Sequence, residues 1–281
     1  MGEFGGHAGR AVLTGDTLHL AGEPSHDALP ACEAPEIARE WQVRVLYGPH
    51  GAPDFFTPED VDMIRETAWK VHYNSNRTGV RLTGPKPRWA RQDGGEAGLH
   101  PSNIHDNAYA IGAVDFTGDM PIILGPDGPS LGGFVCPFVV IAADLWKVGQ
   151  LAPGDSVRFV AVSDEAAATA LARQDAAVAG SALPPAPAVV ADLGSPILHS
   201  VEACGPRPAA RIRRQGDQHL LVEYGPIVLD LELRLRVHAL MLEIEAIGLP
   251  GIIDVTPGIR SLQIHYDSRV LPLERLMETL L

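Results

Sequence analysis

Turn-forming residues and carboxylates crowd into residues 100–134 and limit what this part of the chain can form. The stretch holds six glycines, four prolines and four aspartates, and it contains no lysine or arginine. The apolar runs between the turn residues, such as Ile-Ile-Leu at 122–124, are short and suit strands. A core segment would not need the carboxylates, and a linker would not need the apolar runs. We therefore expect short strands joined by turns, with the polar residues gathered in a site.

The same alternation of turns and short runs continues through the first half of the chain. Residues 41–47 alternate between apolar and polar side chains, as a strand with one buried face does. Gly-Asp turns accompany such runs near residue 15 and again at 151–160. One helix has its start signals in order, with Thr57 as the N-cap and Pro58 at the first helical position. Many short strands with one or two helices predict a mostly-β closed barrel.

A change of composition divides the chain. Residues 1–163 carry the barrel pattern, and residues 164–206 are rich in alanine, proline and valine, which is typical of a linker. Residues 207–281 show the order strand, strand, helix, strand, strand, helix, which predicts a small α+β domain. The apolar run between Asp230 and Gly248 fits a strand or a helix by periodicity. Its length, the aspartate cap and the closing glycine favour a helix.

Composition excludes several classes of protein. A formal net charge of -13 argues against nucleic acid as a partner, because a phosphate backbone requires a basic surface. No apolar run approaches the length of a membrane span, and the first residues lack the pattern of a secretory signal. The cysteines Cys32, Cys136 and Cys204 form no CxxC pair, so neither a disulfide framework nor a zinc site is expected. We expect a cytoplasmic protein that binds neither nucleic acid nor a membrane.

A first polar patch follows the predicted helix, at residues 73–82. Arg77 has the geometry to bind a carboxylate with two hydrogen bonds, and the neighbouring amides suit a planar ureido group. The alternative is purely structural, because Asn74 or Asn76 can end a helix in the left-handed conformation.

A second polar patch lies within residues 100–134. Asp115 stands between apolar residues, so it is expected inside a strand, where a buried carboxylate needs partners. Asp119 belongs to a Thr-Gly-Asp turn, and the glycine-rich residues 128–134 can bring backbone N–H groups near an anion. Ordinary turn chemistry is the alternative for the turn residues, and it is weaker for Asp115.

No metal site is predicted. His100, His105 and Asp106 carry possible ligand atoms, but a histidine in a loop is usually solvated. The sequence also lacks a phosphate-binding P-loop, a G-x-S-x-G elbow and an H-E-x-x-H helix. Cys136 stands in an apolar context and is expected in the core rather than as a nucleophile.

Several motifs resemble one family of enzymes. YNSNRTGVRL at 73–82, FTGDMPIILGPDGPSLGGF at 116–134 and LWKVGQLAPGDSVRF at 145–159 resemble the carboxyltransferase part of urea carboxylases, which is related to allophanate hydrolase subunit 2 and to 5-oxoprolinase subunits. IRRQGDQHLLVEYG at 212–225 and PGIRSLQIHYD at 257–267 resemble the partner family, allophanate hydrolase subunit 1.

The resemblance implies a fold and a reaction. It implies cyclophilin-like β-barrels, here a partial one followed by a small α+β domain. It also implies that biotin, carboxylated in a separate biotin carboxylase domain that uses ATP and magnesium, reaches this region on a carrier domain. A urea or guanidine nitrogen then takes the carboxyl group. The implied partners are those two domains and a second barrel.

The resemblance also suggests site residues. The implied catalytic residues are Tyr109, Asp115 and Asp119. The implied residues for binding substrate or biotin are Asn76, Arg77, Ser102, Asn103, Gly132 and Gly133. A carboxylate at Asp115 suits a guanidinium cation, whereas a neutral asparagine there would suit urea.

The chain departs from the family pattern in what it lacks. It has no front part of subunit 2, no second barrel, no ATP site and no biotinyl-lysine motif. We therefore expect that it does not complete a turnover alone, and that an incomplete barrel exposes apolar faces. Two alternatives stay open. One is an amide hydrolase subunit of the 5-oxoprolinase or allophanate hydrolase type, and the other is a non-enzymatic module like the family's kinase inhibitors.

Overall fold

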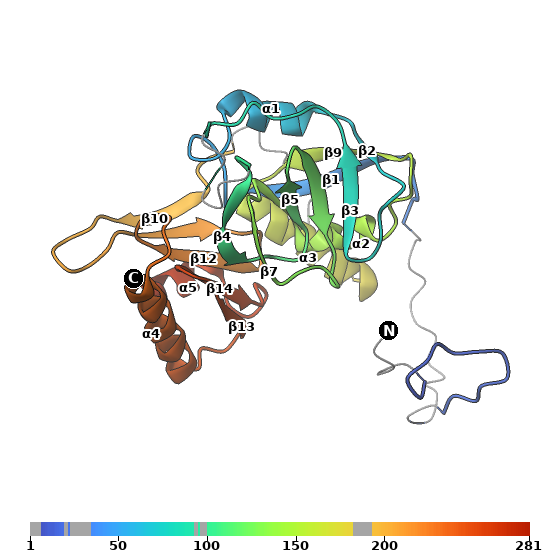
Figure 1. Cartoon of the computed structure of the whole chain (residues 1–281). Helices are drawn as coiled ribbons and strands as arrows, with labels where there is room; N and C mark the ends of the chain where they lie inside the picture. The colour runs from blue at the N-terminus through green and yellow to red at the C-terminus, as the bar shows by residue number, and fades with distance from the viewer. Residues whose placement is uncertain (1–6, 20–21, 23–34, 93–94, 96–99, 182–192) are drawn as a thin grey trace. The chain divides into compact units, whose positions relative to one another are not determined.

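A computed structural model describes residues 7–19, 22, 35–92, 95, 100–181 and 193–281 (Figure 1). The chain divides into two compact units, Met1–Glu33 and Ala34–Leu281. In the first unit Arg10 pairs with Asp16 across the expected turn at Gly15, with Nη1 and Oδ2 2.7 Å apart. The strand expected beside this turn does not form in residues 11–19. The second unit holds all the helices and strands described below.

A closed seven-stranded barrel forms the first part of this unit, in the order β1-β8-β5-β6-β3-β2-β9. Its strands are β1 (Glu40–Tyr47), β2 (Trp69–Val71), β3 (Gly79–Thr83), β5 (Ala113–Thr117), β6 (Met120–Leu124), β8 (Phe138–Val140) and β9 (Ser156–Ala161). The strands alternate as predicted, because Trp41, Val43 and Val45 point inward from β1. The mostly-β barrel is therefore confirmed.

The barrel closes where β1 pairs in parallel with β9, with Trp41 opposite Val157. This sheet is thus not the partial barrel expected from the sequence, and it does not leave the open strand edges of one. A separate two-stranded ribbon, β4 (Asn103–Ala108) with β7 (Leu131–Phe134), lies beside it. Helix α1 (Pro58–Glu66) begins as predicted, because Thr57 accepts the Asp60 N–H and Pro58 occupies the first turn.

A five-stranded sheet follows, in the order β10-β11-β12-β14-β13. Its elements are β10 (Ile197–Val201), β11 (Ala210–Arg214), β12 (His219–Tyr224), α4 (Leu231–Ile247), β13 (Ile252–Pro257), β14 (Ser261–Tyr266) and α5 (Leu273–Leu280). Val237 and Ile244 of α4 and Leu276 of α5 pack into one core with the sheet. The expected strand and helix order over residues 207–281 is confirmed, and so is the choice of helix between Asp230 and Gly248.

Residues 164–206 contain regular structure that the linker-like composition did not indicate. Helix α3 (Asp164–Val178) begins at the cap Ser163 and packs alanines against Leu46 and Ile141. Alanine is the best helix former, so the same composition that suggests a linker also permits this helix. Residues 182–192 lie outside the described residues. The short elements η1 (Ala142–Asp144) and α2 (Leu145–Val148) complete the barrel part.

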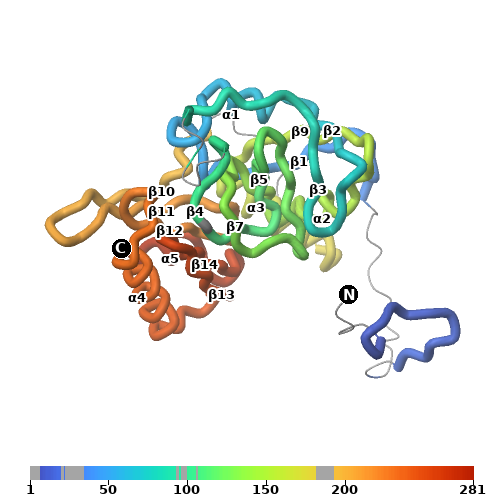
Figure 2. The backbone as a smooth tube through the Cα atoms, in the orientation of Figure 1, coloured from blue at the N-terminus to red at the C-terminus, as the bar shows by residue number. Residues whose placement is uncertain are grey.

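The loop between β11 and β12 connects the barrel to the second sheet. Gln215 donates from Nε2 to the Ala108 carbonyl oxygen at 2.7 Å, and Asp217 accepts the Ala142 N–H at 3.0 Å. Arg213 donates to the Pro49 carbonyl oxygen at 3.2 Å. β4 lies next to β14 as a result (Figure 2).

Candidate functional site

A pocket of about 350 Å³ opens beside strands β5, β6 and β7. Four residues predicted from the sequence meet there: Asn76, Tyr109, Asp115 and Gly132. The other lining residues are Asn74, Thr78, Gly79, Arg81, Thr117, Ile122, Leu124, Pro129, Leu131 and Phe134. Strand pairing brings these segments together, because β6 pairs with both β5 and β3. We call this the Asp115 pocket.

Asp115 is the buried carboxyl group of this pocket. Its side chain is 3% exposed and accepts a hydrogen bond from Thr117 Oγ1 at 3.2 Å. The Tyr109 hydroxyl is a second donor to it. Burial raises the pKa of Asp115 to about 7, and the two hydrogen bonds oppose that rise. Near neutral pH the group is therefore present both as an acid and as a carboxylate.

Tyr109 is held in place by β7. Its hydroxyl oxygen accepts the Phe134 N–H at 2.8 Å, and burial raises its pKa. A side chain at Gly132 would collide with the Tyr109 ring, so glycine is required where this ring lies against the strand. Tyr109 thus lies between a backbone donor and the Asp115 carboxyl group.

Asn76 and Arg77 differ in their placement. Asn76 lines the pocket, and its side-chain oxygen accepts the Thr78 N–H at 2.9 Å, so the amide also stabilises the local turn. Arg77 forms an ion pair with Asp127, has a side chain that is 82% exposed, and does not line the pocket.

Asp119 and Ser102 belong to a different cluster. Asp119 contacts Lys86 Nζ at 2.9 Å, His100 Nε2 at 3.2 Å and Trp89 Nε1 at 3.2 Å. Ser102 Oγ lies 3.0 Å from His100 Nδ1. Partial burial disfavours the Asp119 carboxylate, but hydrogen bonds from Lys86 and Trp89 lower its pKa. The ionised form is therefore favoured at Asp119, whereas Asp115 is only partly ionised near neutral pH.

The last two predicted residues lie in the β4–β7 ribbon. Asn103 pairs with Phe134, and its carbonyl oxygen accepts a hydrogen bond from Arg91 at 2.8 Å. Gly133 follows Gly132 in β7 and does not line the pocket. Asp115 and Tyr109 line the same pocket, and their chemical roles remain predictions.

Thr117 and Arg81 also line the pocket without having been singled out from the sequence, and so does Asn74 of the predicted polar patch. Thr117 could have been predicted from Asp115, because residues two apart on a strand share one face. Asn74 and Arg81 come from the loop before β3 and from β3 itself. Their placement depends on the pairing of β3 with β6, which no local pattern indicates.

The described part of the chain bears on metal ligation and on membrane insertion. No group of three histidine, cysteine, aspartate or glutamate side chains lies close enough there to hold a metal ion. None of the described helices is long and apolar enough to span a membrane. The side chain of Asp106 and the whole of Cys32 lie outside the described residues.

Two family models match the chain. Residues 1–161 match the carboxyltransferase domain, subdomains A and B, and residues 210–281 match the carboxyltransferase domain, subdomains C and D. Among curated proteins, urea amidolyase of Lachancea kluyveri is 43% identical over all of this chain, and urea amidolyase of Saccharomyces cerevisiae is 41% identical. The chain spans 16% of the length of each of these two relatives.

A solved structure agrees in fold. The urea carboxylase of Kluyveromyces lactis matches 88% of this chain with a TM-score of 0.83 and 42% identity, and the chain covers 22% of it. The barrel and the motifs at residues 73–82 and 116–134 lie within the first matched region, and strands β11 to β14 of the second sheet lie within the second. The chain therefore belongs to the carboxyltransferase domain family.

Proposed function

We propose that this chain is the acceptor-binding part of a biotin-dependent enzyme that transfers a carboxyl group to a urea or guanidine nitrogen. The observation that carries the proposal is the buried Asp115 carboxyl group, which lines a pocket and has a pKa of about 7. A perturbed carboxyl group in a pocket is typical of a proton-transfer site. The names of the relatives support urea or a close analogue as the acceptor.

Asp115 has the properties required of a general base in this reaction. The acceptor nitrogen must lose a proton when it forms the new C–N bond. Because the pKa of Asp115 is about 7, its carboxylate is present at neutral pH and accepts that proton on a side-chain oxygen. Thr117 and Tyr109 orient the carboxyl group with one hydrogen bond each.

The residues of the Asp115 pocket also suit biotin. When bound, biotin supplies the carboxyl group from its ureido ring. Asn76, Thr117 and Tyr109 offer polar groups for a planar ureido ring, and Ile122 and Phe134 offer apolar surface for the rest of the molecule. We propose that Asn76 and Gly132 contact this ring, whereas Arg77, Ser102, Asn103 and Gly133 act from outside the pocket.

The choice between urea and guanidine depends on the charge of Asp115. A carboxylate attracts a guanidinium cation, and a hydrogen bond to a charged group contributes about 1.5–3 kcal/mol. Urea is neutral and gains less from that charge. We propose that guanidinium is the preferred acceptor above pH 7, where the Asp115 carboxylate predominates.

The partners follow from the proposed reaction. A biotin carrier domain, a biotin carboxylase domain that uses ATP and magnesium, and a second barrel would complete the enzyme. We propose a cytoplasmic location, which the free thiols of Cys136 and Cys204 support, because oxidising compartments favour disulfides.

A chimera tests the proposal. This chain replaces the matching segment of the Kluyveromyces lactis urea carboxylase, and carboxylation of urea and of guanidine is measured. We expect activity in the chimera and a loss of at least about 100-fold with Asp115→Asn, as is typical of removing a general base. Asp62→Asn is the control, because Asp62 is a surface residue paired with Arg65. An inactive chimera, or full activity with Asp115→Asn, contradicts the proposal.

A further inference from the structure

Arginines line a second pocket, of about 410 Å³, between the barrel and the second sheet. Arg91, Arg211, Arg213 and Arg260 face two carboxylates, Asp54 and Glu223, across it. The remaining lining residues are Phe55, Ala209, Gly225, Pro226 and Ile227. This arginine pocket shares no lining residue with the Asp115 pocket.

Positive charge exceeds negative charge in the arginine pocket. Glu223 accepts from Arg213 Nε at 2.5 Å and from Arg260 Nη2 at 2.8 Å, and Asp54 lies 3.2 Å from Arg213 Nη2. Burial disfavours the Glu223 carboxylate, but the two arginines lower its pKa to about 2. Among the lining residues, the three guanidinium groups of Arg211, Arg213 and Arg260 thus share two carboxylates, Asp54 and Glu223.

Two of these arginines keep donors for a ligand. Arg211 has a side chain that is 49% exposed, and its ion pair with Asp54 is long, at 3.4 Å. Arg260 gives Nη2 to Glu223 and makes a long contact of 3.4 Å from Nη1 to the Gly225 carbonyl oxygen. A guanidinium carries five N–H donors in a planar fork that matches a carboxylate.

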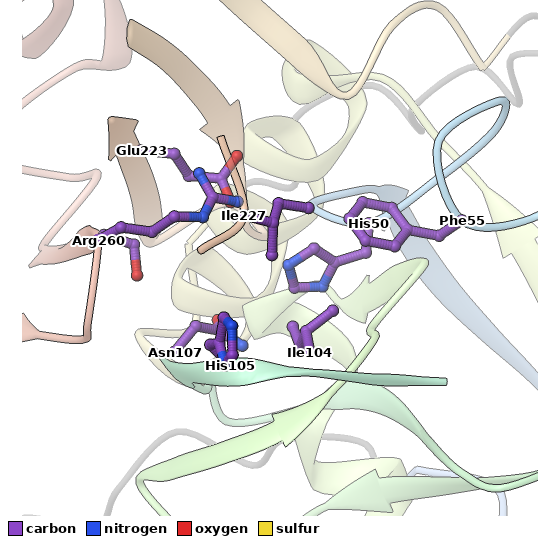
Figure 3. Close-up of a pocket in the computed structure, with 9 residues that line it drawn as sticks. His50, Phe55, Ile104, His105, Asn107, Glu223, Ile227 and Arg260 are labelled. Atoms are coloured by element: carbon purple, nitrogen blue, oxygen red, sulfur yellow. The ribbon is translucent and has the colours of Figure 1, made fainter. Parts of the chain in front are cut away.

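A small polar recess adjoins the arginine pocket (Figure 3). Its volume of about 10 Å³ admits one water-sized group. The recess shares Phe55, Glu223, Ile227 and Arg260 with the arginine pocket. In Figure 3, Glu223 and Arg260 lie on one side of it, and Asn107 and His105 rise from β4 on the other.

Asn107 is the unusual residue of the recess. Its side chain is 4% exposed, and neither its amide nitrogen nor its amide oxygen has a hydrogen-bond partner among the described residues. A buried amide without partners costs free energy, so native proteins usually satisfy it with water or a ligand. Asn107 offers both a donor and an acceptor.

His50 adds a donor to the same recess. Its Nδ1 accepts the Cys136 N–H at 3.0 Å, so in the neutral ring the proton must be on Nε2. Burial lowers the pKa of His50 to about 3, which keeps the ring neutral. The ring also packs edge-on against Phe55, with ring centres 5.0 Å apart, and this fixes its orientation.

We propose that the arginine pocket and its recess bind a small carboxylate that also carries an amide or ureido group. Arg211 and Arg260 hold the carboxylate, and Asn107 in the recess binds one polar atom of the amide. The contacts of the pocket and recess residues support this site by themselves. The proposal goes beyond the carboxyl transfer proposed above. An N-carboxylated urea, the product class of that reaction, belongs to this class of ligand.

Calorimetric titration of the full chain with three probes tests the proposal. Oxamate joins a carboxylate to an amide, acetate has the carboxylate alone, and oxamide has the amide groups alone. We expect oxamate to bind at least about fivefold more tightly than acetate, because it adds a hydrogen bond to Asn107, and we expect no saturable binding of oxamide.

Two variants and one control locate the site. Asn107→Leu should weaken oxamate about fivefold to the level of acetate and leave the melting temperature unchanged or higher, because it removes an unpaired buried amide. Arg211→Gln should weaken both carboxylates roughly tenfold. Arg88→Gln is the control, because Arg88 is an exposed arginine outside both pockets.

Three outcomes would overturn the proposal. One is that sulfate, titrated as a fourth probe, binds as tightly as oxamate, which would mean a site for any anion. Another is unchanged oxamate binding in Arg211→Gln, which tests the pocket even if Asn107→Leu fails to fold. The third is a large loss of stability in Asn107→Leu with oxamate binding retained by the folded fraction, which would make Asn107 a purely structural residue.

Discussion

At the scale of single residues, the chemistry of this chain depends on where a few polar groups are buried. Asp115 and Asp119 stand four positions apart and both resemble family site residues, yet one is buried with neutral donors and the other is paired with Lys86. Their pKa values shift in opposite directions for that reason. The sequence predicted both as site residues, but it could not predict which of them has basic neighbours.

The stability of the chain should depend on the ionisation of Asp115. The folded state raises its pKa from about 3.8 to about 7, so the protonated form is stabilised. The contribution of Asp115 to the free energy of unfolding is therefore fully present below about pH 4 and is lost as the pH rises through 7. Between pH 4 and pH 8, the free energy of unfolding of Asp115→Asn should rise by on the order of 4 kcal/mol relative to that of the wild type.

Thermal unfolding at several pH values measures this difference. Heat is preferable to urea or guanidinium as the denaturant, because both are candidate acceptors. A constant difference in stability between the wild type and Asp115→Asn from pH 4 to pH 8 would show that Asp115 titrates with an ordinary pKa in the folded chain.

Gly132 should be intolerant of a side chain. Gly132→Ala would push the Tyr109 ring away from β7, and overpacking of this kind costs about 1–3 kcal/mol. Ligand binding in the Asp115 pocket should fall with it, because Tyr109 donates to Asp115. Melting temperature and ligand titration check this, with Gly149→Ala as the control at an exposed glycine with room for a methyl group. Equal behaviour of the two variants would refute the role of Gly132.

At the scale of elements, the capping residues were the most informative part of the sequence. Thr57 and Asp230 each predicted a helix start that the structure has. Alternation predicted β1 and its inward face. Helix α3 could not be predicted from composition, because alanine-rich segments occur both in helices and in linkers and only packing against Leu46 and Ile141 distinguishes them.

The cap of α4 should contribute measurably to stability. Asp230 accepts the backbone N–H groups of Glu232 at 2.7 Å and Leu233 at 3.2 Å. Asp230→Ala should therefore destabilise the chain by about 1 kcal/mol, whereas Asp62→Ala on the surface of α1 should change stability by less than about 0.5 kcal/mol. Calorimetric melting of both variants measures the difference. No difference between them would mean that α4 does not depend on this cap.

At the scale of the whole molecule, two sheets are joined by a few polar contacts that the sequence did not reveal. Gln215 donates to the Ala108 carbonyl oxygen and accepts from Gln263 Nε2 at 2.8 Å. The Asp115 pocket likewise depends on pairings between strands that are not consecutive in the chain. Fold class follows from local patterns, but the meeting of Asn76 with Asp115 follows from strand order, which local patterns do not encode.

Breaking the Gln215 contacts should weaken the joint between the sheets. Gln215→Leu would leave the Ala108 carbonyl oxygen and the Gln263 amide unpaired in the interior, at a cost of about 2 kcal/mol. We expect faster hydrogen exchange in β4 and β12 and a lower melting temperature. Unchanged exchange in both strands would mean that other contacts determine how the two sheets are held.

The most direct test of the central claim is calorimetric titration of guanidinium and urea into the chain at pH 6 and pH 8, with Asp115→Asn as the comparison. If Asp115 is the acceptor-binding carboxyl group, guanidinium should bind more tightly at pH 8, because the carboxylate then predominates over the acid. Asp115→Asn should abolish that gain and leave urea binding at least as strong. Guanidinium binding that changes neither with the pH nor with the substitution would contradict this role of Asp115.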